Sequence, residues 1–165
     1  MEAGDLFFGR RIRQNHAIEH ATVTVLARHI PDLRLSARSS SRGFVIFADM
    51  DPDMVRRAAH EALARLQGGE AELAVHPNCG TNLAVGTSLA MVGSLLALNA
   101  VRPRVRVVSA LASSVAGIVA ARPLGQVVQR HLTTLPDVAD VRIVSVLRRR
   151  RLGFATVEVR THASP

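Results

Sequence analysis

Two histidines and a glutamate lie close together in the segment His16-Ala17-Ile18-Glu19-His20. If this segment is helical, His16 and His20 lie one turn apart on one face, with Glu19 at the edge of that face. Two imidazoles placed in this way can bind one metal ion, and a carboxylate between them can act as the general base for a water molecule. The order H-x-x-E-H therefore predicts a zinc site in which Glu19 is the catalytic residue.

A second pair of metal-binding residue types, His76 and Cys79, follows about sixty residues later in the segment HPNC. Their spacing in a turn suits chelation of one ion. A catalytic zinc has three protein ligands and an open position, whereas a structural zinc has four. If only one of the pair binds together with His16 and His20, we expect a hydrolase. If both bind, we expect a structural or metal-sensing His3Cys site, and Glu61 is a further candidate for the third ligand.

These residues also have ordinary structural interpretations. His16, Glu19 and His20 can be polar residues of a surface helix, because short motifs occur often without function. Cys79 can be a buried apolar thiol, and His76 can be the last residue of a strand. The protein would then be a membrane scaffold without a metal. Four other histidines have no partner pattern and are expected on the surface: His29, His60, His131 and His162.

The charge of the chain favours phosphate-bearing partners. All 21 basic residues are arginine, and the net charge is +8. Arginine pairs well with lipid headgroups and with nucleic acid. Nucleic acid is the weaker candidate, because the chain has no Tyr or Trp on which bases could stack and its arginines are dispersed. The single cysteine excludes an intramolecular disulfide.

Two segments have the length and composition of membrane spans. Residues 83–101 contain no charged residue, and residues 107–121 are uncharged between Arg106 and Arg122. Small residues at every fourth position predict close helix packing within the hairpin and a homo-oligomer formed through the same faces. These residues are Gly86, Ala90, Ser94, Ser109, Ser113, Gly117 and Ala121. The alternative is a helical hairpin buried in a soluble core.

The remaining segments predict a soluble part with helices and strands. We expect helices over residues 10–30, 52–67 and 123–134, the second capped by Asp51 or Asp53. Strands are expected over residues 33–37 and 44–48 around the turn SSSRG, over residues 71–76, and over residues 141–147 and 152–160. The last two strands form a hairpin across a turn of four arginines: Arg148, Arg149, Arg150 and Arg151.

Together these segments predict an α+β fold: a small mixed sheet with packed helices, interrupted by a two-helix transmembrane hairpin. Residues 1–80 form the N-terminal α+β part, residues 81–122 the hairpin, and residues 123–165 complete the same soluble domain. The N-terminus lacks a signal peptide, which favours a bacterial inner-membrane protein with both termini in the cytoplasm. The three arginines of the connecting loop oppose this orientation, but those of the other segments outnumber them. A run of four arginines is most often a solvated loop, and beside a membrane it can also contact anionic lipids.

Two resemblances add to this interpretation. The segment HAIEH is similar to the site of the inverzincin metallopeptidases, which implies that His16 and His20 are ligands and that Glu19 is the base. The strings "RQNHAIEHATVTVL" and "GGEAELAVHPNCGTNLAVG" resemble an uncharacterised family of small bacterial membrane proteins with a domain of unknown function. This resemblance implies membrane residence and a single site containing both histidine-bearing stretches.

Overall fold

The fold class is α+β, as the sequence predicts, in a computed structural model that describes residues 9–100, 102–151 and 153–164. The described chain divides into two units. The first, here called the sheet unit, contains the residues up to 76 together with those from 130 onward. The second, the hairpin unit, contains residues 77–129. The sheet unit therefore combines both flanks of the hairpin.

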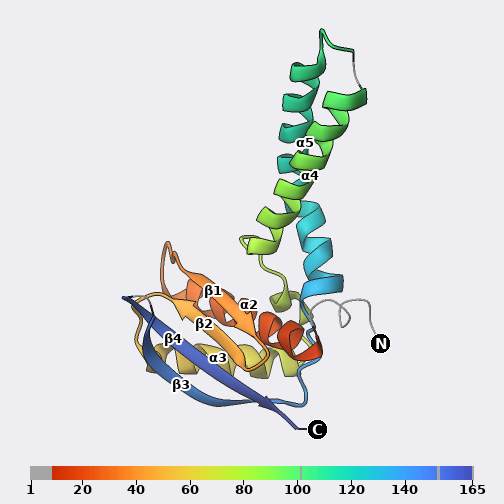
Figure 1. Ribbon diagram of the computed structural model, residues 1–165. Helices are drawn as coiled ribbons and strands as arrows, with labels where there is room; N and C mark the ends of the chain where they lie inside the picture. The colour runs from red at the N-terminus through yellow and green to blue at the C-terminus, as the bar shows by residue number, and fades with distance from the viewer. Residues whose placement is uncertain (1–8, 101, 152, 165) are drawn as a thin grey trace. The chain divides into compact units, whose positions relative to one another are not determined.

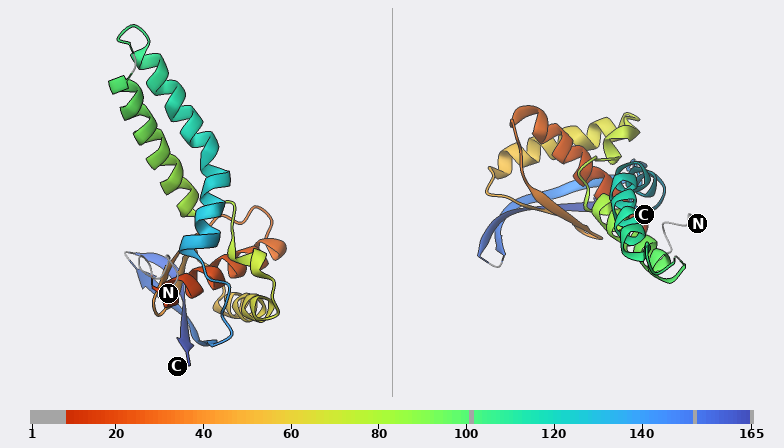
Figure 2. Two further views of the ribbon diagram at one scale, coloured as in Figure 1. Left: turned by 90° about the vertical axis from the view of Figure 1, so that its right-hand side faces the viewer. Right: turned by 90° about the horizontal axis from the view of Figure 1, so that it is seen from above.

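The sheet unit is a four-stranded sheet with two helices on one face (Figure 1). The strand order is β1-β2-β4-β3, and the sheet, which we expected to be mixed, is antiparallel in each pairing. Figure 2 shows the same layering from two further directions. The elements are α2 (Arg10–His29), β1 (Ser36–Ser40), β2 (Gly43–Phe47), α3 (Pro52–Gln67), β3 (Val141–Arg151) and β4 (Phe154–Ala163).

Helix α2 packs on β1 and β2, beside α3, which packs on β3, and the apolar face of α2 forms much of the core. The buried apolar residues of this helix are Ala17, Ile18, Ala21, Val25 and Leu26. The helix ends at His29 because the residue before Pro31 is forced out of the helical region, and Ile30 is extended. Helix α3 begins after Asp51, whose carboxylate accepts a hydrogen bond from the Asp53 N–H at 3.0 Å. Asp51 is therefore the cap.

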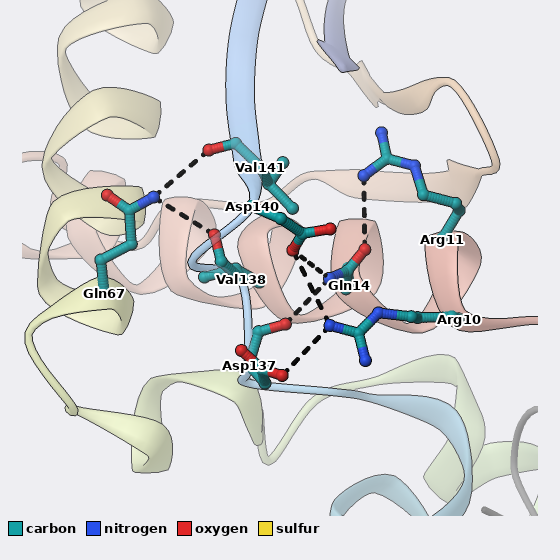
Figure 3. Close-up of polar contacts among 8 residues, drawn as sticks. All are labelled: Arg10, Arg11, Gln14, Gln67, Asp137, Val138, Asp140 and Val141. Carbon is teal, nitrogen blue, oxygen red and sulfur yellow. Dashed lines mark hydrogen bonds and ion pairs between the residues drawn. The ribbon is translucent and has the colours of Figure 1, made fainter. Parts of the chain in front are cut away.

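Polar side chains fix both helices to the connection that precedes β3 (Figure 3). Gln14 of α2 donates to the carbonyl of Asp137 at 2.9 Å and to the carboxylate of Asp140 at 2.8 Å. Gln67 of α3 donates to the carbonyls of Val138 and Val141, both at 3.2 Å. The chain that returns from the hairpin unit is thereby tied to elements that precede the hairpin.

Two sequence predictions about the sheet need correction. Strand β1 covers Ser36–Ser40 rather than 33–37, because the serines pair with β2 and the turn is shorter than SSSRG. The four arginines are not a turn: Arg148 to Arg151 pair with Val157 to Phe154 in β4. The chain reverses next to Gly153, whose φ of 83° suits glycine. A charged run thus lies within a strand because a neighbouring strand satisfies its backbone.

The segments next to the hairpin also differ from expectation. The predicted strand over 71–76 is a 3₁₀ helix, η1 (Ala71–Ala74), because its backbone is satisfied by local bonds such as Leu73 N–H to Glu70 O at 3.1 Å. The predicted separate helix over 123–134 is the end of a longer one. Helix α5 (Arg106–Val128) continues through Pro123 and passes directly into a π-helix, η2 (Gln129–Thr133).

The hairpin unit consists of α4 (Gly80–Ala100) packed side by side with α5 (Figure 2). Small residues lie at the contact: a Cβ added at Gly117 would lie 2.6 Å from the backbone nitrogen of Ala90. The α4 helix and the α5–η2 helix are long and apolar enough to cross a membrane. Their large apolar side chains are exposed, such as Leu83 at 74% and Val119 at 72%. Within the described residues, the hairpin helices are thus exposed rather than buried in a core.

Candidate metal centre

Three imidazoles meet in the sheet unit and are called here the histidine cluster: His16, His20 and His76. His16 and His20 lie one turn apart on α2, as predicted, and their ring centroids are 4.3 Å apart. His76 follows η1, and its ring centroid lies 5.9 Å from that of His20. Two tetrahedral imidazole ligands with Zn–N bonds of about 2.0–2.1 Å would have ring centroids roughly 5 Å apart. The observed spacings lie on either side of this value.

The hydrogen bonds of His16 and His20 define which nitrogen can bind a metal. His20 Nδ1 donates to the carbonyl of Ala74 at 2.7 Å, and His16 Nδ1 donates to the carbonyl of Thr133 at 3.0 Å. A carbonyl can only accept, so Nδ1 carries the proton and Nε2 carries the lone pair in each neutral ring. This is the arrangement of metal-binding histidines, whose second nitrogen donates to a carbonyl or carboxylate.

The environment keeps the three imidazoles neutral. Burial lowers the pKa of His20 to about 3, with a further contribution from the neighbouring His16, while the bond to Ala74 opposes the change. Burial also lowers the pKa of His16 and that of His76. A neutral imidazole is the form that binds metal ions. His16 and His76 are only partly buried, so an ion can reach the cluster from solvent.

Glu19 is on the side of α2 that faces the sheet. The residue is 6% exposed, and its carboxylate accepts a hydrogen bond from the hydroxyl of Ser39 in the edge strand β1. Burial raises the pKa of Glu19 to about 7, although the bond to Ser39 opposes the change. A carboxylate with a pKa near 7 can accept a proton at neutral pH, which is a property of general bases.

The other two predicted ligands lie in different surroundings. Cys79 belongs to the hairpin unit, three residues after His76 in the chain, and its sulfur accepts a hydrogen bond from the N–H of Thr81 at 3.4 Å. By residue type, His16, His20 and Cys79 form a candidate His/Cys metal-binding group. Glu61 is on the exposed side of α3, where it pairs with Arg65 at 3.6 Å.

Sequence reasoning missed the partners that orient the site. The acceptors at Ala74 and Thr133 are backbone atoms, so no side-chain type could reveal them. Ser39 is the first of three consecutive serines in strand and turn, and nothing in the pattern distinguishes it. Arg13 was also missed: it is 1% exposed, one turn before His16 on α2.

Comparison with known proteins gives a family without an assigned activity. A model of a domain of unknown function, DUF6391, matches residues 11–146. The chain belongs to this family. It is also 35% identical over 134 residues to an uncharacterised protein of Picosynechococcus sp.. The match covers 74% of this chain and 65% of that relative. No solved structure matches the chain. The DUF6391 region contains α2, the histidine cluster and both helices of the hairpin.

Proposed function

We propose that this DUF6391 protein is an integral membrane protein that binds zinc through His16, His20, His76 and Cys79. The observation that carries the proposal is the pair of Nδ1–H bonds to backbone carbonyls, which present Nε2 of His16 and of His20 as ligand atoms. Imidazole nitrogens and a cysteine thiolate are the donor set that zinc prefers.

Charge balance supports a dication at this place. The Glu19 carboxylate is buried in the same helix, one residue from His20, and a buried charge is costly unless it is compensated. Three neutral imidazoles offer no compensation. A zinc ion with one thiolate ligand retains one positive charge, which would balance the carboxylate.

Metal analysis of the detergent-purified full chain tests this proposal. We expect about one zinc per chain in the wild type and loss of zinc in His16→Ala and His20→Ala. His29→Ala is the matched control, because His29 is an exposed residue of the same helix and should not affect zinc binding. Cys79→Ser tests the fourth ligand. Wild-type protein without zinc, or equal zinc in all variants, would contradict the proposal.

A second candidate function is zinc-dependent hydrolysis of peptides, as in the inverzincins. It is favoured by the buried carboxylate of Glu19 directly before His20, in the order that those enzymes use. Zinc acidifies water, and Glu19 would accept the proton of the attacking water. This function requires that either His76 or Cys79 is not a ligand. Glu19→Gln should then abolish peptide hydrolysis and retain zinc, whereas a closed site would show no hydrolysis in the wild type.

We also propose that α4 and α5 cross the bacterial inner membrane with both flanks in the cytoplasm. The two flanks share one sheet, so they must lie on the same side of a bilayer, as two spans require. Most arginines belong to these flanks, which favours the cytoplasmic side. A C-terminal green fluorescent protein fusion should fluoresce in cells. An alkaline phosphatase fusion that is active instead would reverse the orientation.

A further inference from the structure

The two histidines of α2 hold the two segments that connect the sheet unit with the hairpin unit. His20 donates to Ala74, near the end of the entry segment, residues 71–76. His16 donates to Thr133 in the exit segment, residues 130–135. These acceptors lie on opposite sides of the hairpin in the sequence, yet the two donor rings are 4.3 Å apart by their centroids.

The exit segment has a second attachment that does not use an imidazole. Arg13 donates through one Nη to the carbonyls of His131 and Thr134, both at 3.3 Å. The N–H of Leu135 donates to the carbonyl of Arg13 at 3.0 Å. Without a metal, the exit segment therefore remains attached to α2 through hydrogen bonds that do not involve an imidazole.

The start of the exit segment is a rare element. Its π-helix η2 has wider turns than an α-helix, and such turns are rare and frequently lie at functional sites. The hydroxyl of Thr133 is buried without a hydrogen-bond partner among the residues that the structure describes. Neighbouring contacts must offset the free-energy cost of burying this hydroxyl without a hydrogen bond. The His16 bond to the Thr133 carbonyl is one of these contacts.

We propose that zinc binding at the histidine cluster locks the entry and exit segments, so that the hairpin responds to metal occupancy. Coordination at Nε2 fixes each ring and withdraws electron density, which makes its Nδ1–H a stronger donor. Both carbonyl bonds, to Ala74 and to Thr133, are then strengthened together. This lock rests on the proposed zinc site and gives that site a sensing role.

The coupling is reciprocal. If zinc stabilises the locked segments by some factor, a change in the hairpin that loosens them lowers zinc affinity by the same factor. The site can therefore report metal availability to the membrane segment, and the state of the membrane segment can in turn release the metal.

Hydrogen exchange of the full chain in lipid nanodiscs, followed by mass spectrometry, tests the lock. Zinc is compared with a chelator, and zinc content is measured on the same samples. We expect amides of both connecting segments to exchange about 5- to 150-fold more slowly with zinc, the usual range of allosteric coupling. Amides of β3 and β4 should change much less and serve as the internal reference.

Two variants sharpen the test. His76→Ala removes a proposed ligand but leaves the bonds of His16 and His20. Zinc should therefore have little effect on the exchange of this variant. His29→Ala should behave as the wild type. Suppose that one zinc binds per chain but amide exchange slows uniformly, slows in only one of the two segments, or does not slow. The proposed lock would then be wrong, and the proposed zinc site would be retained. Absence of bound zinc would overturn both.

Discussion

Replacement of Glu19 by glutamine should stabilise the metal-free protein, and the gain should depend on pH. The carboxyl group is buried against Ser39, and its pKa is raised from 4.5 to about 7. A raised pKa means that the folded state binds the proton more tightly than the unfolded state does. Stability is therefore lost as the pH rises from 4.5 to 7, and the loss is complete above that range. Glutamine keeps the shape without the charge.

The size of the effect follows from the pKa change. One pKa unit corresponds to 1.36 kcal/mol, so the full penalty is about 3 kcal/mol above pH 8 and about 1 kcal/mol at pH 5. Glu19 is well buried, so solvent screening removes little of this value. For a domain of this size, about 3 kcal/mol corresponds to a rise in Tm of roughly 10–20 °C at pH 8.

Far-UV circular dichroism during thermal unfolding is a suitable assay, because the chain has no Trp or Tyr for fluorescence. The histidines titrate in both proteins, so the difference between wild type and Glu19→Gln isolates the carboxyl group. Glu61→Gln is the matched control, since Glu61 is an exposed residue in a surface ion pair worth at most about 1 kcal/mol. Zinc should reduce the advantage of glutamine by stabilising the carboxylate. A Tm difference that is the same at pH 5 and pH 8 would refute the burial of an ionisable group at this position.

Three further predictions concern the metal, the hairpin and the lipid. Addition of a chelator should lower Tm, because zinc at 100 times its Kd stabilises the folded state by about 2.7 kcal/mol, and an unchanged Tm would argue against a bound ion. Gly117→Ala should weaken the packing of α4 on α5 by about 1–3 kcal/mol in detergent unfolding, whereas Gly80→Ala, where an added Cβ meets nothing within 4 Å, should not. Replacing Arg148 and Arg150 by glutamine should weaken binding to phosphatidylglycerol by about 1 kcal/mol per residue, and equal binding to neutral lipid would contradict a headgroup contact.

Helices α2, α3 and α4 could be predicted from the sequence because their signals are local. Pro31 ends α2, Asp51 begins α3, and the uncharged runs define the hairpin. The strands were less predictable because their limits depend on partners far away in the chain. Arg148 to Arg151 form a strand only because β4 pairs with them, and residues 71–76 fail to form one because they do not pair with the sheet.

The candidate site likewise combines features that local sequence predicts with features that only the tertiary fold determines. The spacing of His16 and His20 predicted their shared face, because it depends only on helix geometry. The orientation of their rings could not be predicted, because the acceptors are carbonyls of residues 74 and 133, which only the tertiary fold brings to α2. Likewise, the burial of Glu19 depends on the edge strand that carries Ser39. The sequence could therefore identify candidate ligands but not the tautomers that present Nε2 as the ligand atom.

The position of the histidines on α2 favours a function that needs both the metal and the hairpin. Ala17, Ile18 and Ala21 are fully buried in the core, while His16 and His20, on the adjacent face, contact the entry and exit segments. A simple membrane anchor would not require buried imidazoles, whose low pKa makes them costly in acid. A soluble zinc domain would not require the hairpin. The family match covers the histidine cluster and the hairpin in one region, residues 11–146, as the proposed coupling of a metal site to a membrane segment requires.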